Sequence, residues 1–254
     1  MAKKKLKKSI LAYVKKNAPK HADVSVIVPT LNEEKYIERC LNSLRKQRYF
    51  GTYEIIVADG YSTDKTRDIA KNYADKVVIE HTRTIASGRQ AGASVASGKI
   101  IVYTGADVIV PADWLTRICA PFADKNVSAA FGSLIPYDGT AFDDVLCKLV
   151  LNPMAGVLHA LGFIYVYGDN MAFKRKAFDL IGGFNVDLVT AEDTDIMKRV
   201  CSTGKVEYVP KAQVLFSMRR VRKWGYFRYI FFHTINFFRS HLTGKVFEKY
   251  EPVR

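Results

Sequence analysis

Short apolar segments alternate with helix-like segments in the first half of the chain, and this alternation limits the possible folds more than any other feature. The four apolar segments are rich in β-branched residues and end at turn-forming or polar positions. They are Val24–Val28, Tyr53–Ala58, Lys76–Ile79 and Ile100–Thr104. Helical patterns separate them. The order predicts an α/β fold with an open, mostly parallel central sheet flanked by helices.

Three polar loops follow predicted strands, at Pro29–Asn32, Asp59–Asp64 and Gly105–Asp107. In open sheets of this kind, ligands bind beyond the carboxyl ends of the strands. We therefore expect the three loops to meet at one crevice.

The second half of the chain is less regular. It predicts a strand near Ala129–Ile135, short helices near Arg175–Ile181 and Asp193–Cys201, and a last strand at Glu207–Val209. No internal repeat or low-complexity linker interrupts the chain. We expect one domain over residues 23–218, a basic amphipathic segment over 1–22, and a basic aromatic helical tail over 219–254.

Acidic residues in the loops after predicted strands are candidates for ligand binding. The Asp59 carboxylate could accept the N–H groups of a uracil or guanine base, or it could cap a local turn. Asp107 could be an oxygen ligand of Mg²⁺ or Mn²⁺ at a diphosphate, or an ordinary loop carboxylate. Asn32 could cap the following helix, with Glu33 and Glu34 in its first turn.

Three carboxylates occur within four residues at Glu192, Asp193 and Asp195. One of them, held in a closed site, could serve as a general base for a hydroxyl group. Alternatively, the three acids could form the first turn of a helix, where the helix dipole favours negative charge.

The net charge of +14 is concentrated at the two ends of the chain. Residues 1–20 contain eight lysines and no acidic residue, and residues 211–254 contain ten Lys and Arg against Glu248 and Glu251. The long middle part is nearly neutral. Basic ends on a near-neutral body indicate contact with a polyanionic surface.

The apolar residues among these charges favour a membrane surface. Leu6, Ile10, Leu11 and Val14 recur at helical spacing among the lysines, which predicts an interfacial amphipathic helix. The stretch from Trp224 to Phe238 interleaves aromatic residues with arginine, as lipid–water interfaces favour. Ordinary core or solvated helices would be an alternative, and binding to nucleic acid a weaker one. We expect an anionic membrane partner and no nucleic acid.

The chain is expected to lie on the membrane rather than cross it. Leu149–Tyr167 is the only apolar stretch of suitable length, and Asn152, Pro153 and His159 interrupt it. The start of the chain does not match a secretory signal. The four cysteines are widely spaced and contain no CxxC pair, which favours reduced thiols in a cytosolic compartment. The expected location is cytoplasmic, peripheral at the inner face of the cell membrane.

Several motifs, taken in order, resemble glycosyltransferase family 2. They are VSVIVPTLNEEKYIERCLNSL, EIIVADGYSTDKT, GRQAG with ASGKIIVYTGAD, GDNMAFKR with FDLIGGFN, and TAEDTD. The resemblance covers about residues 23–224. It implies a GT-A type nucleotide-binding fold and an inverting hexosyltransferase that works in cell-envelope or glycan biosynthesis. The implied donor is a UDP- or GDP-sugar, and the basic ends with the aromatic tail favour a lipid-linked or membrane-proximal acceptor.

The resemblance also implies roles for individual residues. Asp193 would be the catalytic base, with Glu192 beside it. The nucleotide-sugar side would comprise Pro29, Thr30, Asn32, Glu33, Asp59, Arg89, Ala106 and Asp107. The acceptor or diphosphate side would comprise Gly183, Asn170, Arg220, Lys223 and Trp224. Asp107, the last acid of the Asp-x-Asp motif, would bind a divalent cation, Mn²⁺ or Mg²⁺.

The chain departs from this motif at Gly105, which replaces its first acid. The loss is expected to weaken cation binding, or to leave Arg89, Arg219 and Arg220 to share the diphosphate charge. Two alternatives remain open, a catalytically impaired binding module and a polyprenyl-phosphate sugar synthase. A nucleotidyltransferase is disfavoured because Pro29–Glu34 lacks a glycine-rich basic loop. The sugar, the acceptor and the oligomeric state stay undetermined, as does the nucleotide of the donor, UDP or GDP.

Overall fold

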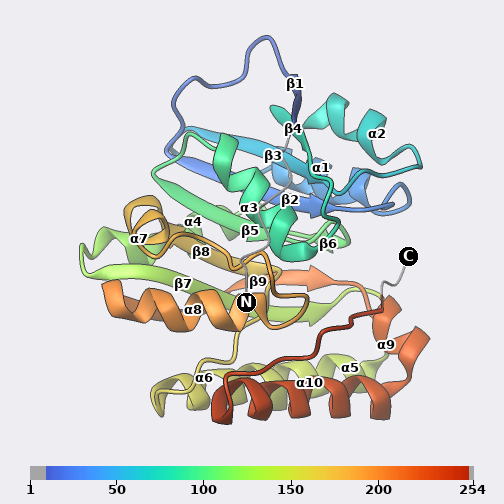
Figure 1. The fold of residues 1–254 in the computed structure, drawn as a ribbon, viewed down its shortest axis with the longest axis vertical. Coiled ribbons are helices and arrows are strands. Elements are labelled where there is room, and N and C mark those ends of the chain that lie inside the picture. The colour runs from blue at the N-terminus through green and yellow to red at the C-terminus, as the bar shows by residue number, and fades with distance from the viewer. Residues whose placement is uncertain (1–9, 252–254) are drawn as a thin grey trace.

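A nine-stranded sheet, with helices on both faces, runs through residues 10–251, the part of the chain that the computed structural model describes (Figure 1). The strand order across the sheet is β1-β4-β3-β2-β5-β8-β7-β9-β6. The strands are β1 (Ile10–Val14), β2 (Val24–Thr30), β3 (Tyr53–Asp59), β4 (Lys76–Ile79), β5 (Ile100–Thr104), β6 (Val108–Ile109), β7 (Val127–Pro136), β8 (Asn170–Lys174) and β9 (Lys205–Phe216).

Helices connect most of these strands. The α-helices are α1 (Ile37–Arg45), α2 (Thr66–Tyr73), α3 (Ile85–Val95), α4 (Trp114–Cys119), α5 (Ala141–Leu146), α6 (Asn152–Ala160), α7 (Arg175–Leu180), α8 (Glu192–Val200), α9 (Arg219–Trp224) and α10 (Tyr226–Leu242). Short 3₁₀ segments lie at η1 (Ala120–Ala123) and η3 (Cys201–Thr203), and a π-helical turn, η2 (Cys147–Leu151), joins α5 to α6.

The four strands predicted in the first half are neighbours in the sheet. β2 pairs in parallel with β3 and β5, and β3 pairs in parallel with β4. Beyond β5 the sheet becomes mixed, because β8 runs antiparallel to both β5 and β7 while β7 and β9 are parallel. The α/β fold class is therefore confirmed, and the strands predicted in the first half of the chain form the purely parallel part of the sheet.

Side-chain alternation explains why both faces of this half are covered. Val24, Val26 and Val28 of β2 belong to the core cluster that contains the apolar side of α1. Ile27 points to the other face, into a cluster with Ala91 of α3. A strand buried on both faces reads as a continuous apolar run, which is what Val24–Val28 shows.

The helix expected near the N-terminus is wrong over residues 10–14. These residues form β1, which pairs antiparallel with β4 at the edge of the parallel strands. An exposed edge strand offers unsatisfied backbone groups that favour such pairing over an isolated helix. Leu6, the first residue of the expected helix, lies outside the described residues.

The cap expected at Asn32 is also wrong. α1 begins four residues later than that cap requires, and Asn32 adopts a left-handed backbone with φ of 55°. Its Oδ1 accepts the Thr63 N–H at 2.8 Å, and its own N–H donates to Ser62 Oγ at 2.8 Å. Asn32 therefore joins the loops after β2 and β3 to each other.

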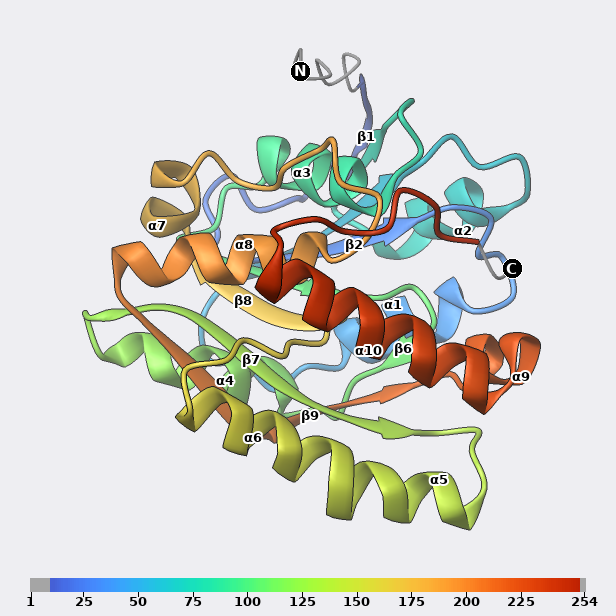
Figure 2. The same cartoon turned by 60° about the horizontal axis from the view of Figure 1, so that its bottom comes forward.

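The C-terminal tail is helical, as expected, over α9 and α10. α5, α6 and α10 form the lower layer of the molecule in Figure 1, and Figure 2 turns this layer toward the viewer. Among residues 10–251, no helix is long and apolar enough to cross a membrane.

Candidate active site

A cavity of about 640 Å³ opens at the carboxyl ends of β2 and β5. The loops after these two strands form one side of it, and α9, α10 and residues 165–169 and 189–194 form the other. The crevice predicted from the strand order therefore exists. It is closed by elements from the second half of the chain.

Most of the predicted site residues line this cavity. They are Pro29, Thr30, Glu33, Arg89, Ala106, Asp107, Glu192, Asp193 and Arg220. The others do not line it. They are Asn32, Asp59, Asn170, Gly183, Lys223 and Trp224.

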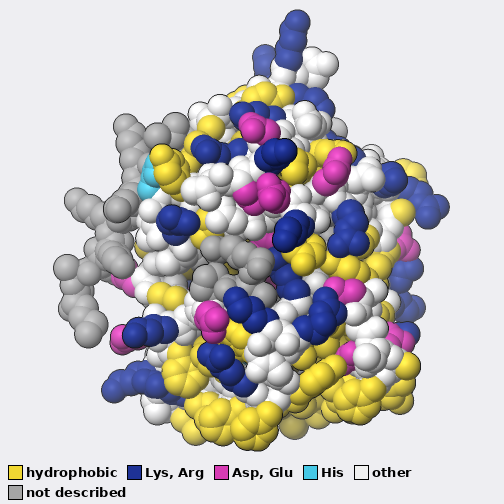
Figure 3. Space-filling view, turned by 90° about the vertical axis from the view of Figure 1, so that its right-hand side faces the viewer, with side chains coloured by type: hydrophobic (Ala, Val, Ile, Leu, Met, Phe, Trp, Pro, Cys, Tyr) yellow, Lys and Arg dark blue, Asp and Glu magenta, His cyan; other side chains and the backbone are white. Residues whose placement is uncertain are grey.

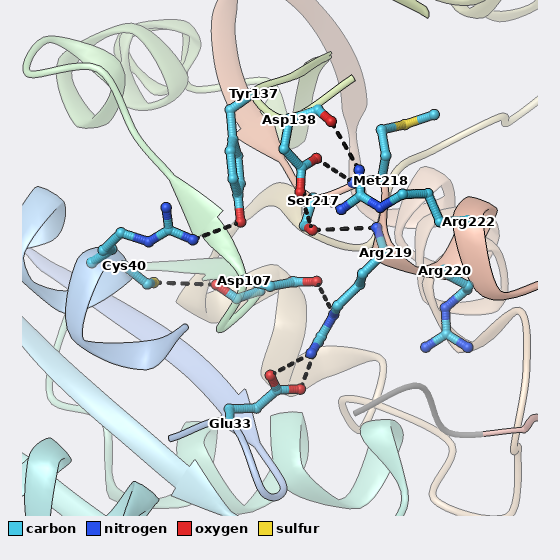
Figure 4. Close-up of polar contacts among 12 residues, drawn as sticks. Glu33, Cys40, Asp107, Tyr137, Asp138, Ser217, Met218, Arg219, Arg220 and Arg222 are labelled. Atoms are coloured by element: carbon cyan, nitrogen blue, oxygen red, sulfur yellow. Dashed lines mark hydrogen bonds and ion pairs between the residues drawn. The ribbon is translucent and has the colours of Figure 1, made fainter. Parts of the chain in front are cut away.

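Two ion pairs that share Arg219 join the two sides of the cavity (Figure 4). The Arg219 guanidinium donates to both Glu33 carboxylate oxygens, at 2.6 and 2.8 Å, and its Nε donates to Asp107 Oδ2 at 2.7 Å. The three side chains are largely buried. Arg219 therefore places a fixed positive charge beside Asp107, the predicted ligand of the divalent cation.

Asp138 positions this arginine by anchoring the start of α9. Its Oδ1 accepts the Met218 N–H at 2.7 Å, and its Oδ2 accepts Ser217 Oγ at 2.8 Å and Arg222 Nη2 at 2.6 Å (Figure 4). A carboxylate at a helix N-terminus satisfies backbone donors and is favoured by the helix dipole. No local pattern in the sequence indicates this role of Asp138, because its partners lie about 80 residues further along the chain.

Asp59 is fully buried at the end of β3. Its carboxylate accepts hydrogen bonds from Thr30 Oγ1 at 3.2 Å, from Ser62 Oγ at 2.6 Å and from the Ser62 N–H at 2.8 Å. These contacts correspond to the turn-capping alternative. Base recognition by Asp59 stays a prediction.

A buried ion pair connects α3 to the start of α8. Arg89 Nη1 donates to Glu192 Oε1 at 2.5 Å, and Arg89 Nη2 donates to the Gly168 carbonyl at 2.7 Å. Burial raises the pKa of Glu192, and the Arg89 charge opposes this shift. The pair fixes the first turn of α8 against the cavity wall.

Asp193 is the next residue after Glu192 in the sequence, and it faces the cavity. Its Oδ1 accepts the Thr194 N–H at 2.6 Å. Burial raises the pKa of the carboxyl above its usual range, while Arg89 and the Thr194 hydrogen bonds lower it. Asp195, the third acid of the cluster, instead pairs with Arg199 on the same helix at 2.6 Å. Of these three acids, only Asp193 both lines the cavity and has no guanidinium bonded to it in the described residues.

Gly183 supports the site from outside the cavity. It has φ of +68°, and a methyl group there would lie 2.3 Å from Gln90 Oε1. That same oxygen accepts the Phe184 N–H at 2.9 Å. Gln90 of α3 thus holds the turn at Gly182, Gly183 and Phe184 against that helix.

Asn170 is a core residue, and its assignment to the acceptor side is wrong. Its amide is fully buried, accepts Trp114 Nε1 at 3.0 Å, and donates to the carbonyls of Ser133 and Ala212 at 2.9 and 2.7 Å. The neighbouring Asp169 faces the cavity instead. Successive side chains alternate at the start of a strand, so a shift of one residue exchanges a core position for a site position.

The basic residues of α9 divide between two environments. Arg220 lines the cavity and stacks over the rings of Trp224 and Tyr250, at 5.4 and 4.3 Å. Trp224 packs beneath it against Phe232 and Tyr250 and is buried. Lys223 points away and approaches Glu251 at 3.8 Å.

An aromatic wall closes the cavity on the α10 side. It consists of Tyr229, Phe232 and Phe237 of α10, together with Tyr250 from the following segment. Burial, followed by the Arg220 charge, lowers the pKa of the adjacent His233 to about 4 and keeps it neutral. The helical spacing of these residues was present in the sequence, but it could equally describe a face turned to a membrane.

Comparisons with known proteins relate the chain to glycosyltransferases. The family model described as glycosyl transferase family 2 matches residues 25–182. Glycosyltransferase AglE of Haloferax volcanii is 25% identical over 71% of this chain and 62% of its own length. A Methanococcus voltae enzyme is 35% identical over 71% of this chain and 62% of its own length. It is described as a dolichyl N-acetyl-α-D-glucosaminyl phosphate 3-β-D-2,3-diacetamido-2,3-dideoxy-β-D-glucuronosyltransferase.

Solved structures show the same fold. The mannosyltransferase PcManGT from Pyrobaculum calidifontis, in complex with GDP-Man and Mn²⁺, superposes with a TM-score of 0.68 at 26% identity. The match covers 92% of this chain and 68% of that one. Glucosyl-3-phosphoglycerate synthase from Mycobacterium tuberculosis superposes with a TM-score of 0.58 at 19% identity, over 86% of this chain and 79% of that one. The chain matches somewhat less than two thirds of the length of each curated relative, the Haloferax volcanii and the Methanococcus voltae enzyme.

Proposed function

Because the chain belongs to glycosyltransferase family 2, we propose that it transfers a sugar from a UDP- or GDP-sugar, with inversion, to a lipid-linked or membrane-proximal acceptor. One observation carries the proposal. Asp107, at the end of the nucleotide-binding half, and Asp193, at the start of α8, line the same cavity. The donor diphosphate and the acceptor hydroxyl could therefore meet between them.

On the donor side, the loops after β2 and β5 would hold the nucleotide. Pro29, Thr30 and Ala106 line this part of the cavity. The Arg219 guanidinium, already bonded to Asp107, lies where negative charge would grow on the departing diphosphate. PcManGT binds GDP-Man and the Methanococcus voltae relative acts on a dolichyl phosphate-linked sugar, which supports this donor and acceptor class.

On the acceptor side, Asp193 would take the proton of the attacking hydroxyl. The oxygen then forms the new bond to the anomeric carbon as the bond to the diphosphate breaks, and attack from the opposite face inverts that carbon. The pKa of Asp193 is raised by burial, and a carboxylate with a raised pKa is a better base near neutral pH. Glu192 and Arg89 would orient it.

A divalent cation, Mn²⁺ or Mg²⁺, fits the donor side of the cavity. Such ions bind through one or two carboxylates together with substrate phosphates and water, and Asp107 presents one such carboxylate. Among the described residues, no group of three or more His, Cys, Asp or Glu forms a complete site. When bound, the cation would neutralise charge on the leaving diphosphate.

The outer surface of the same helices supports work at a membrane. Phe227 is 81% and Leu242 80% exposed on α10, the helix whose inner side lines the cavity. Phe142, Leu149 and Leu161, on and beside α5 and α6, are also exposed. Figure 3 shows apolar side chains gathered at this end, with basic side chains above them. We place the enzyme peripherally at the inner, cytoplasmic membrane face, where its four cysteines would stay thiols.

A nucleotide-binding panel tests the donor assignment. Thermal unfolding would be measured with UDP, GDP and their sugars, each with Mn²⁺, Mg²⁺ or chelator, on wild type and Asp107→Ala. We expect one nucleotide to stabilise the wild type in a manner that needs both the cation and Asp107. No shift with any nucleotide would contradict the proposal.

Asp193→Asn then separates the two acceptor classes. Loss of transfer with donor binding retained would identify a hydroxyl acceptor. An active variant would identify the alternative, a polyprenyl-phosphate sugar synthase, because a phosphate acceptor needs no deprotonation.

A further inference from the structure

The family's metal motif is incomplete in this chain because Gly105 provides no side chain. The sheet, however, brings another carboxylate to that point. β5 and β8 run antiparallel with Thr104 opposite Asn170, so the next residues along each strand, Gly105 and Asp169, leave the sheet beside each other. Asp169 comes from a part of the chain more than 60 residues away.

The geometry at Gly105 is specific. A methyl group placed there would lie 2.9 Å from Asp169 Oδ1 and 3.2 Å from Asp107 Oδ1. The space that a side chain at residue 105 would enter is therefore flanked by one oxygen from each of two carboxylates. The other oxygen of Asp107 is bonded to Arg219, which leaves Oδ1 on the side of Asp169.

We propose that Asp169 supplies the second carboxylate for the divalent cation, in place of the side chain missing at Gly105. This inference rests on the proposed function, because the cation is the one expected with the donor diphosphate. It assigns a metal-binding role to a residue that lies outside the Asp-x-Asp motif.

The surroundings of Asp169 suit that role. Its side chain is 43% exposed and lines the cavity, so a ligand can reach it. Among the described residues, its one ion-pair contact is a long one, 3.9 Å from Arg89 Nη2. Two carboxylates that face one point repel each other. A divalent cation between them would remove this repulsion and could be coordinated by one oxygen of each.

The first test measures Mn²⁺ binding directly by electron paramagnetic resonance, with UDP or GDP present. We expect Asp169→Asn and Asp107→Asn each to weaken Mn²⁺ binding at least tenfold. The control Asp179→Asn, which neutralises an exposed acid on α7, should bind as the wild type does. Thermal unfolding in chelator checks that each variant is folded. Unchanged Mn²⁺ affinity in folded Asp169→Asn would overturn the inference.

The second test moves the carboxylate back into the motif. Gly105→Asp alone would crowd the Asp169 carboxylate, whereas Gly105→Asp with Asp169→Ala opens the space that the new side chain needs. Gly105 lacks a positive φ, so a side chain there is not strained by the backbone. We expect the double variant to recover most of the Mn²⁺ affinity that Asp169→Ala loses. Failure of a folded double variant to recover affinity would count against a shared cation position.

The two proposals fail in different ways. If the wild type binds neither nucleotide, the proposed function itself is wrong. If the wild type binds nucleotide and Mn²⁺, and Asp107→Asn loses the Mn²⁺ while Asp169→Asn keeps it, only the role of Asp169 is wrong.

Discussion

At the scale of single residues, the site depends on the buried ion pair between Arg89 and Glu192. The side chains of Arg89 and Glu192 are 4% and 7% exposed, and their ion pair holds the first turn of α8. Removing one member leaves the other charged and buried. We expect Glu192→Gln to lower the free energy of unfolding by about 3 kcal/mol, measured by urea denaturation.

A neighbouring pair provides the control for this prediction. Asp195 and Arg199 form an ion pair one turn apart on α8, with side chains about one third exposed. Water screens such a pair, so Asp195→Asn should cost about 0.5 kcal/mol or less. Equal losses in the two variants would show that burial at Glu192 does not matter.

The protonation state of Asp193 determines the expected pH dependence. A general base works only when it is deprotonated, so activity falls as the pH drops through its pKa. Burial raises that pKa in the folded protein. We therefore expect the acid limb of kcat/KM to lie above the ordinary aspartate value of about 3.9. The pH profile in constant-ionic-strength buffer measures it, and a limb at or below that value would contradict the assignment.

At the scale of elements, α10 has two different faces. Tyr229, Phe232 and Phe237 line the cavity, while Phe227 and Phe231 are exposed on the outside. We expect Phe227→Glu with Phe231→Glu to reduce binding to anionic vesicles at least tenfold, in a sedimentation assay, because the outer face would lose the apolar area that enters the interface.

The loop residue Phe50 gives a matched control, since it is fully exposed and remote from α10 in sequence. Like Phe227→Glu on its own, Phe50→Glu removes one exposed aromatic ring and adds one negative charge. It should leave vesicle binding nearly unchanged. A comparable loss in both variants would point to net charge alone rather than to α10.

At the scale of the whole molecule, the charge of +14 predicts how salt affects membrane binding. The screening length shrinks from about 8 Å at 0.15 M salt to about 3 Å at 1 M. We expect binding to vesicles rich in anionic lipid to weaken severalfold over this range, and binding to neutral vesicles to be weak throughout. Binding that does not respond to salt would indicate purely apolar attachment.

Local patterns predicted most of the fold and part of the site. β2, β3, β4 and β5 lie where apolar periodicity placed them, because burial on two faces leaves a strong local signal. The prediction failed at β1, where pairing with an edge strand decided the structure. It also failed at Asn170, where alternation at a strand start turned the neighbouring residue into the cavity.

The sequence alone determined the α/β class, the family resemblance and the positions of Asp107 and Asp193, because these follow from residues close together in the chain. Only the tertiary structure decided that Arg219 binds Asp107 and Glu33, that α10 forms a wall of the cavity, and that Asp169 lies beside Gly105. The reason is physical. These contacts join segments more than 60 residues apart, and strand order and helix packing, rather than any local pattern, bring them together.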